Sequence, residues 1–152
     1  MKCLVYSSTA SLDFDSETLQ ELQKAAVLAN SKVDTTGFLF FRNKTFLQYI
    51  EGDETHIDQL IANLAADSRH QIHFSHHATT DHRRFPDWHM QWITPEDEIQ
   101  LNLESLVHTY LRALKDVSKP DGEDRLQEVI WRLINALAEI RANTDDPRST
   151  PP

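Results

Sequence analysis

The chain has 152 residues and carries 15 basic against 24 acidic side chains, which gives a formal net charge of −9. This balance argues against a nucleic-acid partner and against an anionic membrane surface, and no apolar run approaches the roughly 18 residues of a membrane-spanning helix. The single cysteine, Cys3, excludes an internal disulfide and predicts a reducing, cytoplasmic setting, while only three glycines leave no glycine-rich phosphate loop.

The first half of the chain alternates between strand-like and helix-like patterns. Residues 3–8 form a β-rich run, and a helix is predicted over residues 16–30, preceded by N-capping side chains. Residues 37–42 and 45–51 are two further apolar runs. The short polar link Asn43-Lys44 between them predicts a β-hairpin.

A second helix is predicted to begin after Asp53 and to end near Asp67. Its apolar residues make one face, namely Ile57, Leu60, Ile61 and Leu64. Residues 72–80 and 88–93 are the remaining predicted strands. The resulting order, β-α-β-β-α-β-β, indicates an α+β fold: a ferredoxin-like sheet with a fifth strand and with both helices on one face.

The last third of the chain predicts a helical hairpin. Apolar residues at helical spacing mark a first helix, namely Ile99, Leu103, Leu106, Val107, Tyr110 and Leu114, and a second one, namely Leu126, Ile130, Leu133, Leu137 and Ile140. Residues 119–122 contain Pro and Gly and should turn the chain back. The hairpin can cover the free sheet face, but the four-three spacing of its last helix equally suits a dimer or partner surface.

These patterns divide the chain into three regions. Residues 1–95 should form the sheet domain, and residues 96–142 a helix pair for signal relay or oligomerisation. Residues 143–152 are polar, hold three prolines and are predicted to be disordered.

Gln48 is the most informative polar residue of the predicted strands. With period-2 alternation it shares a face with Phe46 and Ile50. A buried amide without partners costs about 1–3 kcal/mol, so a polar group should lie opposite it. Because a carboxamide offers both a donor and an acceptor, Gln48 is a candidate hydrogen-bond switch.

Six segments, taken together in their order and spacing, carry a specific resemblance. They are Leu4-Val5-Tyr6-Ser7-Ser8, Asn30, Thr36-Gly37-Phe38-Leu39, Phe46-Leu47-Gln48-Tyr49-Ile50-Glu51-Gly52, Asp67-Ser68-Arg69-His70 and Arg84-Phe85-Pro86-Asp87-Trp88-His89-Met90. Over roughly residues 2–94 the chain resembles the BLUF family, the flavin-binding blue-light sensor domains. The resemblance implies a flavin, FAD or FMN, held non-covalently between the two helices with its ring edge facing the sheet.

The resemblance also implies a role for each matching residue. Tyr6 would supply an electron and then a proton to the excited flavin. Gln48 would bridge Tyr6 and the flavin, and its amide would rearrange by rotation or tautomerisation to give a red-shifted signalling state. Asn30 would hydrogen-bond the pyrimidine edge of the flavin, and Arg69 and His70 would lie near its polar side and its ribityl-phosphate chain.

Further residues would form the walls of the flavin site and carry the signal away from it. Trp88 and Met90 match the family's relay pair on the last strand, and Leu28, Ile61 and Leu64 can supply apolar walls. The implied protein is a photoreceptor without a catalytic output domain, hence not an enzyme. It would form a homo-oligomer and signal to a separate effector protein.

Two other functions remain open on the sequence. One is a ferredoxin-like enzyme that uses Arg and Asn on a phosphorylated substrate, although the acidic Ser11-Leu12-Asp13 replaces an anion-cradling loop. The other is a light-independent flavin-binding or protein-interaction module. A metal site is not predicted, since the histidines between His70 and His82 lack a cysteine pair and match no common zinc spacing.

Overall fold

The computed structural model describes residues 1–68 and 70–144, and within them it contains five strands and five helices. The chain separates into two units, residues 1–94 and a second unit that starts at Pro95. In chain order the elements of the first unit are β1 (Lys2–Ala10), α1 (Ser16–Lys32), β2 (Thr36–Arg42), β3 (Thr45–Gly52), α2 (Glu54–Ala66), β4 (His70–Thr79) and β5 (Gln91–Ile93).

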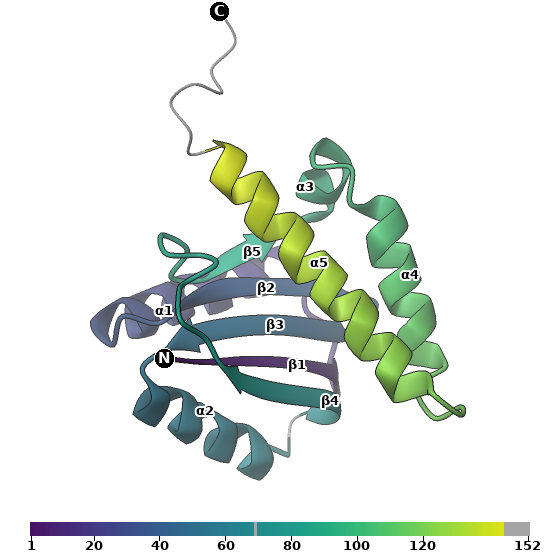
Figure 1. Cartoon of the computed structure of the whole chain (residues 1–152), viewed down its shortest axis with the longest axis horizontal. Coiled ribbons are helices and arrows are strands. Elements are labelled where there is room, and N and C mark those ends of the chain that lie inside the picture. The colour runs from purple at the N-terminus through teal and green to yellow at the C-terminus, as the bar shows by residue number, and fades with distance from the viewer. Residues whose placement is uncertain (69, 145–152) are drawn as a thin grey trace, which may run out of the picture. The chain divides into compact units, whose positions relative to one another are not determined.

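The five strands form one mixed sheet in the order β4-β1-β3-β2-β5 (Figure 1). Strand β1 pairs antiparallel with β3 and β4, β2 pairs antiparallel with β3, and β5 pairs parallel with β2. The first four strands have the ferredoxin-like order and β5 is the added strand. The predicted α+β fold is therefore confirmed.

The β2–β3 hairpin is also confirmed and has a simple local cause. Its two turn residues, Asn43 and Lys44, have φ angles of 51° and 62°. Two consecutive positive φ angles match the right-handed twist of the flanking strands. Gly37 in β2 is required for another reason, because a Cβ there would lie 1.9 Å from the carbonyl oxygen of Tyr49.

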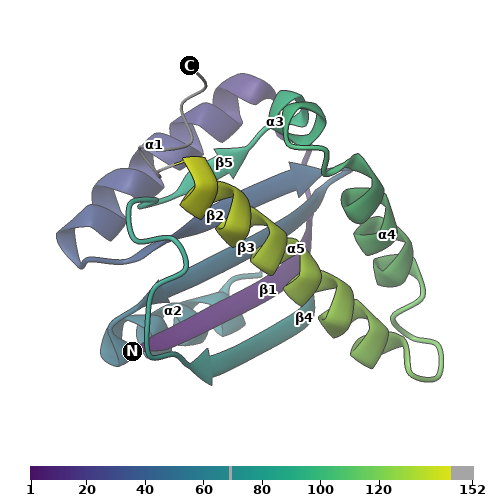
Figure 2. The ribbon, with the colours of Figure 1, turned by 45° about the horizontal axis from the view of Figure 1, so that its top comes forward.

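Helices α1 and α2 lie on one face of the sheet (Figure 2). Ile57 of α2 is fully buried in a cluster with Leu4, Tyr6 and Ile50 of the sheet, against which Leu60, Ile61 and Leu64 pack. Each helix begins at an aspartate whose side chain accepts a hydrogen bond from a backbone N–H two or three residues later. That bond lowers the pKa of the Asp15 carboxyl.

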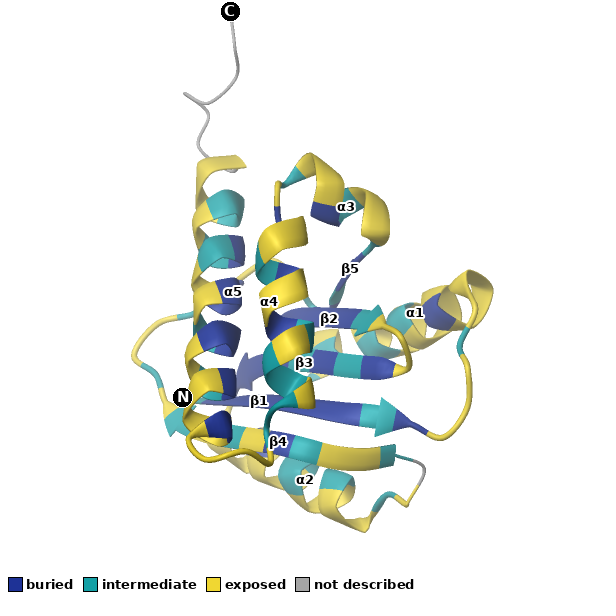
Figure 3. Ribbon diagram, turned by 90° about the vertical axis from the view of Figure 1, so that its right-hand side faces the viewer, coloured by how far each residue is buried: buried dark blue, intermediate teal, exposed yellow. Residues whose placement is uncertain are grey.

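The second unit contains α3 (Pro95–Gln100), α4 (Glu104–Lys115) and α5 (Gly122–Thr144). The predicted continuous helix through Ile99 and Leu103 is wrong, because Asn102 takes a left-handed φ of 55° and ends α3, and Ile99 is 63% exposed. The buried positions of α5 follow one side of the helix (Figure 3). Of the predicted disordered tail, residues 143 and 144 belong to α5, and residues 145–152 lie outside the described part.

None of the helices in residues 1–68 and 70–144 has the length and apolar character needed to cross a membrane.

Candidate functional site

A cavity of about 240 Å³ opens on the helix-covered face of the sheet. Strands β1, β2 and β3 form its floor, and residues of α1, α2 and the connecting loops form its walls. It is lined by Tyr6, Ser8, Ala10, Phe14, Leu22, Leu39, Phe46, Gln48, Leu64, Asp67 and His70. Most of these side chains are apolar, and the polar ones come from β1, β3, the end of α2 and the start of β4.

Tyr6 and Gln48 lie side by side at this cavity because they are register partners across β1 and β3. The Tyr6 hydroxyl donates a hydrogen bond to Gln48 Oε1. At its other end the amide donates from Nε2 to the Met90 sulfur at 3.4 Å. Gln48 is half-buried, and the predicted need of its amide for partners is met by a phenol and a thioether, the second of which is a weak acceptor.

Burial and charge both act on the Tyr6 phenol. Tyr6 is only 8% exposed. Burial raises the pKa of this phenol, and the carboxylate of Asp67, on the same cavity wall, raises it further. The His70 ring lies edge-on to Tyr6, with ring centroids 6.2 Å apart. The phenol therefore keeps its proton at neutral pH and is available as a donor.

Two buried polar atoms among the lining residues, Ser8 Oγ and His70 Nε2, have no hydrogen-bond partner among residues 1–68 and 70–144. A buried polar group left unpaired costs about 1–3 kcal/mol, and such groups are uncommon in native proteins. Their presence on the wall of one cavity indicates that the cavity takes a ligand that is largely apolar and carries polar atoms. A flavin ring has this character.

Some of the predicted site residues line the cavity and others lie elsewhere. Tyr6, Gln48, Leu64 and His70 line the cavity. Ile61 packs against the core cluster beneath α2 rather than on the cavity wall. Leu28 is 62% exposed and is not among the residues that line this cavity, so its role as a wall stays a prediction. Arg69 lies outside the described residues.

Asn30 is placed by a contact that sequence alone does not show. Helix α1 continues past it to Lys32, so Asn30 is not the helix end. Its Nδ2 donates to the backbone oxygen of His89 at 2.6 Å. Gln23 on the same helix donates to the backbone oxygen of Met90 at 3.1 Å. Two amides of α1 thus hold the chain just before β5.

Trp88 and Met90 precede the last strand instead of lying on it. The predicted strand from residue 88 is too long, because β5 begins at Gln91. Met90 is 3% exposed and contacts Gln48. Trp88 stacks on Phe85, with centroids 5.1 Å apart and planes 22° apart. The two predicted relay residues therefore have different neighbours.

Several lining residues were missed by the sequence reasoning. For two of them a signal existed: Ser8 shares the Tyr6 face by alternation, and Leu39 is the register partner of Gln48 on β2. Phe14 lies in the loop before α1 and makes T-shaped contacts with Phe41 and Phe46. Nothing in a loop sequence gives that position.

The histidine-rich strand β4 has local contacts of its own. The Nε2 of His73 lies 2.6 Å from Thr9 Oγ1. Within the part of the chain that the structure describes, no three His, Cys, Asp or Glu side chains are arranged to hold a metal ion.

Comparisons with known proteins point to one family. A family model described as "BLUF: Sensors of blue-light using FAD" matches residues 1–91. Photoactivated adenylate cyclase subunit beta of Euglena longa is 34% identical over 86 residues, which cover 55% of this chain and 10% of that protein. Subunit alpha of the Euglena gracilis enzyme is 32% identical over 87 residues, 56% of this chain and 8% of that protein. The chain thus matches about a tenth of these curated relatives.

Solved structures of similar fold agree with this family. The dark-state structure of BlrB, a BLUF protein, has a TM-score of 0.66 and 26% identity, covering 91% of this chain and 96% of that chain. A bacterial light-regulated adenylyl cyclase has a TM-score of 0.64 and 26% identity, covering 78% of this chain and 36% of that chain. Both support the fold described above.

Proposed function

The chain belongs to the BLUF family of flavin-binding blue-light sensors, and from this premise we propose that Tyr6 and Gln48 turn light absorption into a hydrogen-bond change. One observation carries the proposal: the hydrogen-bonded series from Tyr6 through Gln48 to Met90 borders a cavity with two unpaired polar atoms. Members of the family bind FAD or FMN. When bound, the flavin supplies blue-light absorption and, once excited, a strong electron acceptor.

The cavity residues suit such a cofactor. Phe14, Leu22, Leu39, Phe46 and Leu64 offer apolar surface to an aromatic ring. Ser8 Oγ and His70 Nε2 offer the polar contacts that they lack within the protein. Asn30, whose amide now bonds a backbone oxygen, is proposed to contact the pyrimidine edge, and Ile61 to support the α2 wall from behind.

Tyr6 is proposed as the electron and proton donor. Its raised pKa keeps the hydroxyl proton in place before illumination. Loss of an electron makes a phenol strongly acidic, and the existing bond from Tyr6 to Gln48 Oε1 gives the proton a path. The donor therefore needs no rearrangement before it reacts.

Gln48 is proposed as the switch. In the structure its oxygen faces Tyr6 and its nitrogen faces the Met90 sulfur. Rotation of the amide turns its NH2 donor toward the Tyr6 hydroxyl, and tautomerisation makes its oxygen a donor there, so the direction of the Tyr6 contact is reversed. Rotation also ends the bond to Met90, because a thioether sulfur has no hydrogen to donate. Because the thioether of Met90 is a weak acceptor, little hydrogen-bond energy opposes the change on that side.

The test begins with the visible spectrum of protein purified in dim light. Blue light should shift the flavin bands slightly to the red, and darkness should restore them. Tyr6→Phe should keep the yellow colour and lose the shift. A normal photocycle in Tyr6→Phe would refute the donor role, a yellow wild type without a shift would leave only flavin binding, and a colourless protein would favour an interaction module.

We also propose that the signal leaves through protein contacts. The amphipathic helices α4 and α5 are the proposed relay and self-association elements, with a separate effector protein downstream. The apolar stripe of α5 is already buried within the chain, so self-association would use the outer surfaces of these helices. The single buried Cys3 supports a cytoplasmic setting. Light scattering on the chain with and without residues 96–144 tests it: an unchanged oligomeric state would contradict the assembly role.

A further inference from the structure

Glu51 is a charged residue with no exposed surface, and it lies on the sheet face opposite to Gln48. Side chains alternate along β3, so Gln48 faces the cavity while Tyr49 and Glu51 face away from it. Glu51 is 0% exposed. A buried carboxylate is costly unless its oxygens are hydrogen-bonded, so its partners define its role.

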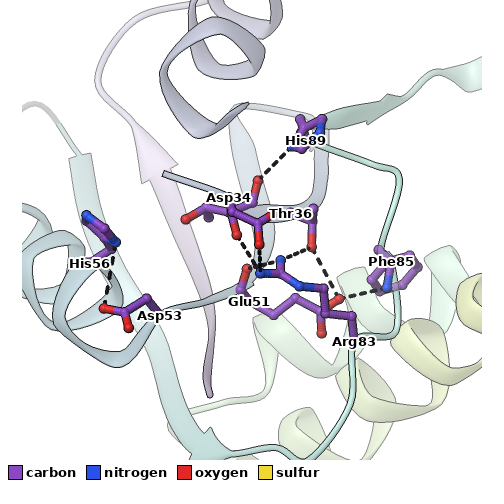
Figure 4. A network of polar contacts seen from close by, with 9 residues as sticks. Asp34, Thr36, Glu51, Asp53, His56, Arg83, Phe85 and His89 are labelled. Atoms are coloured by element: carbon purple, nitrogen blue, oxygen red, sulfur yellow. Dashed lines mark hydrogen bonds and ion pairs between the residues drawn. The ribbon is translucent and has the colours of Figure 1, made fainter. Parts of the chain in front are cut away.

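The donors to this carboxylate come from three parts of the chain. Two of them, Thr36 and Phe85, are seen in Figure 4. Oε1 accepts from the backbone N–H of Phe85 at 2.7 Å and from Thr36 Oγ1 at 3.4 Å. Oε2 accepts from the Tyr49 hydroxyl at 2.9 Å and from the backbone N–H of Arg84 at 3.1 Å. Two of the four donors are thus backbone groups of the β4–β5 connection.

Hydrogen bonds of Arg83 hold the same β4–β5 connection at a second point. The Arg83 guanidinium donates to Thr36 Oγ1 at 2.9 Å and to the Glu51 backbone oxygen at 3.3 Å. It also donates to Asp34 through the backbone oxygen at 2.6 Å and through Oδ2 at 2.9 Å. Arg83 thereby fixes the connection to the start of β2 (Figure 4).

Aromatic packing continues from these bonds to Trp88. Phe85 is fully buried and meets Phe38 and Tyr49 edge-on, at centroid distances of 5.4 and 5.5 Å. Its other side stacks on Trp88. The Trp88 backbone oxygen in turn accepts from Gly37 N–H at 2.6 Å.

Residues 83–90, called here the 83–90 segment, are therefore held differently at their two ends. The backbone oxygens of residues 88–90 accept single hydrogen bonds from Gly37, Asn30 and Gln23, and the Met90 side chain contacts the switchable amide. At Arg84 and Phe85 the segment is held by Glu51 on one face of the sheet. At Met90 it meets Gln48 on the other face. We propose that Glu51 is a positioning residue, which anchors the 83–90 segment so that the light-driven change at Gln48 moves this segment in a defined way.

The physical reason lies in the contrast between the two ends. If neither end of the segment were held by hydrogen bonds, a small displacement of Met90 would be lost within the thermal motion of the segment. With Arg84 and Phe85 fixed, the change is confined to residues 86–90, including Trp88. This inference rests on the proposed role of Gln48, but its test has a separate readout.

The test is hydrogen exchange of the full chain with bound flavin, in darkness and under blue light. In the wild type, light should alter exchange at the amides of residues 87–90, since Pro86 has none, and leave the Arg84 and Phe85 amides protected. Glu51→Gln replaces one acceptor oxygen by a donor NH2 group. Exchange at Arg84 and Phe85 should then rise by about tenfold or more, as expected for a lost charge-assisted bond. The light-induced difference at residues 87–90 should be lost, while the red shift still forms.

Two further variants serve as controls. Glu21→Gln makes the same chemical change on an exposed position of α1 and should leave both readouts unchanged. Tyr49→Phe removes one donor, keeps the ring, and should raise exchange at Arg84 less than Glu51→Gln does. If Glu51→Gln does not fold, hydrogen exchange of Tyr49→Phe tests the anchoring role of Glu51 in its place.

Three results would overturn the proposal. They are a normal light-induced difference in Glu51→Gln, unchanged Arg84 and Phe85 exchange in both Glu51→Gln and Tyr49→Phe, or no light-induced difference at residues 87–90 of a wild type that shows the red shift. Failure of the Tyr6–Gln48 photochemistry would instead appear as a missing red shift in the wild type.

Discussion

The two faces of the sheet carry similar polar pairs that differ in how completely they are satisfied. On the cavity face the Tyr6 hydroxyl donates to Gln48, and on the opposite face the Tyr49 hydroxyl donates to Glu51. Both acceptors belong to β3, and burial raises the pKa of both phenols. The acceptors are chemically different: the amide can exchange donor and acceptor, whereas an ionised carboxylate only accepts.

The surroundings of the two pairs sharpen this difference. Next to Gln48 lie an open cavity and two unpaired polar atoms, Ser8 Oγ and His70 Nε2. Around Glu51 four donors occupy the two carboxylate oxygens. An incompletely satisfied polar cluster can gain from a ligand or a rearrangement, and a satisfied one resists change. We therefore assign the light-driven hydrogen-bond change to the cavity face of the sheet and the fixed anchor to the opposite face.

The largest effect is expected from Gln48→Leu, which removes the convertible group. The variant should bind flavin, because the apolar wall remains, but it should show no red shift after blue light. The visible spectrum before and after illumination measures this. Gln59→Leu, a loss of an exposed amide on α2, is the matched control and should shift normally. A red shift in Gln48→Leu would refute the assignment of the light-driven hydrogen-bond change to the cavity face.

The next largest effect is expected on stability from Glu51→Ala. It leaves two backbone N–H groups and the Tyr49 hydroxyl without their acceptor, at a cost of about 3–5 kcal/mol. Urea unfolding at equal flavin concentration measures the loss. Glu21→Ala on the exposed side of α1 should change stability by less than about 0.5 kcal/mol. Equal stability of the two variants would show that the Glu51 cluster is not an anchor.

An effect of intermediate size is expected at alkaline pH. Because the pKa values of Tyr6 and Tyr49 are raised in the folded state, the unfolded chain releases these protons first. Their contribution to stability is complete below the ordinary tyrosine value near 10 and is lost as pH rises above it, by about 1.4 kcal/mol per pH unit for each phenol. Tyr49→Phe should reduce the stability lost between pH 9 and 11 by about 1.4 kcal/mol in total, measured by urea unfolding, because the unfolded phenol titrates across this range. An unchanged slope would show that Tyr49 does not retain its proton.

Sequence patterns were sufficient for the sheet and its two helices. Strand alternation, aspartate caps and the Asn43-Lys44 turn are local signals, and each acts in the structure as predicted. The patterns failed where a backbone angle decides the outcome. The left-handed Asn102 divides a run that reads as one amphipathic helix. The last strand begins later than predicted: residues 88–90 bond to β2 through one backbone N–H and to α1 through two side-chain amides instead of a strand ladder.

The cavity was predictable only in part. Tyr6 and Gln48 were found because strand alternation and the family resemblance agree on them. Asn30 and Leu28 have helical spacing that does not fix where their side chains meet other segments. The Glu51 anchor was not predicted at all, since two of its four donors, the backbone N–H groups of Arg84 and Phe85, lie more than 30 positions away in the chain. Contacts of that kind depend on tertiary structure.

The smallest expected effect concerns Ser8, and it tests the cavity face most directly. Its hydroxyl is buried and has no partner within the protein. If it is reserved for the flavin, Ser8→Ala should weaken flavin binding by about three- to tenfold, the value of one neutral hydrogen bond. Without flavin, the variant should be as stable as the wild type or slightly more so, because an unpaired buried hydroxyl has been removed. Flavin titration followed by fluorescence, together with urea unfolding of the flavin-free protein, measures both. Unchanged affinity with raised stability would mean that Ser8 is merely an unsatisfied core residue, and the contrast between the two faces would then rest on Gln48 and His70 alone.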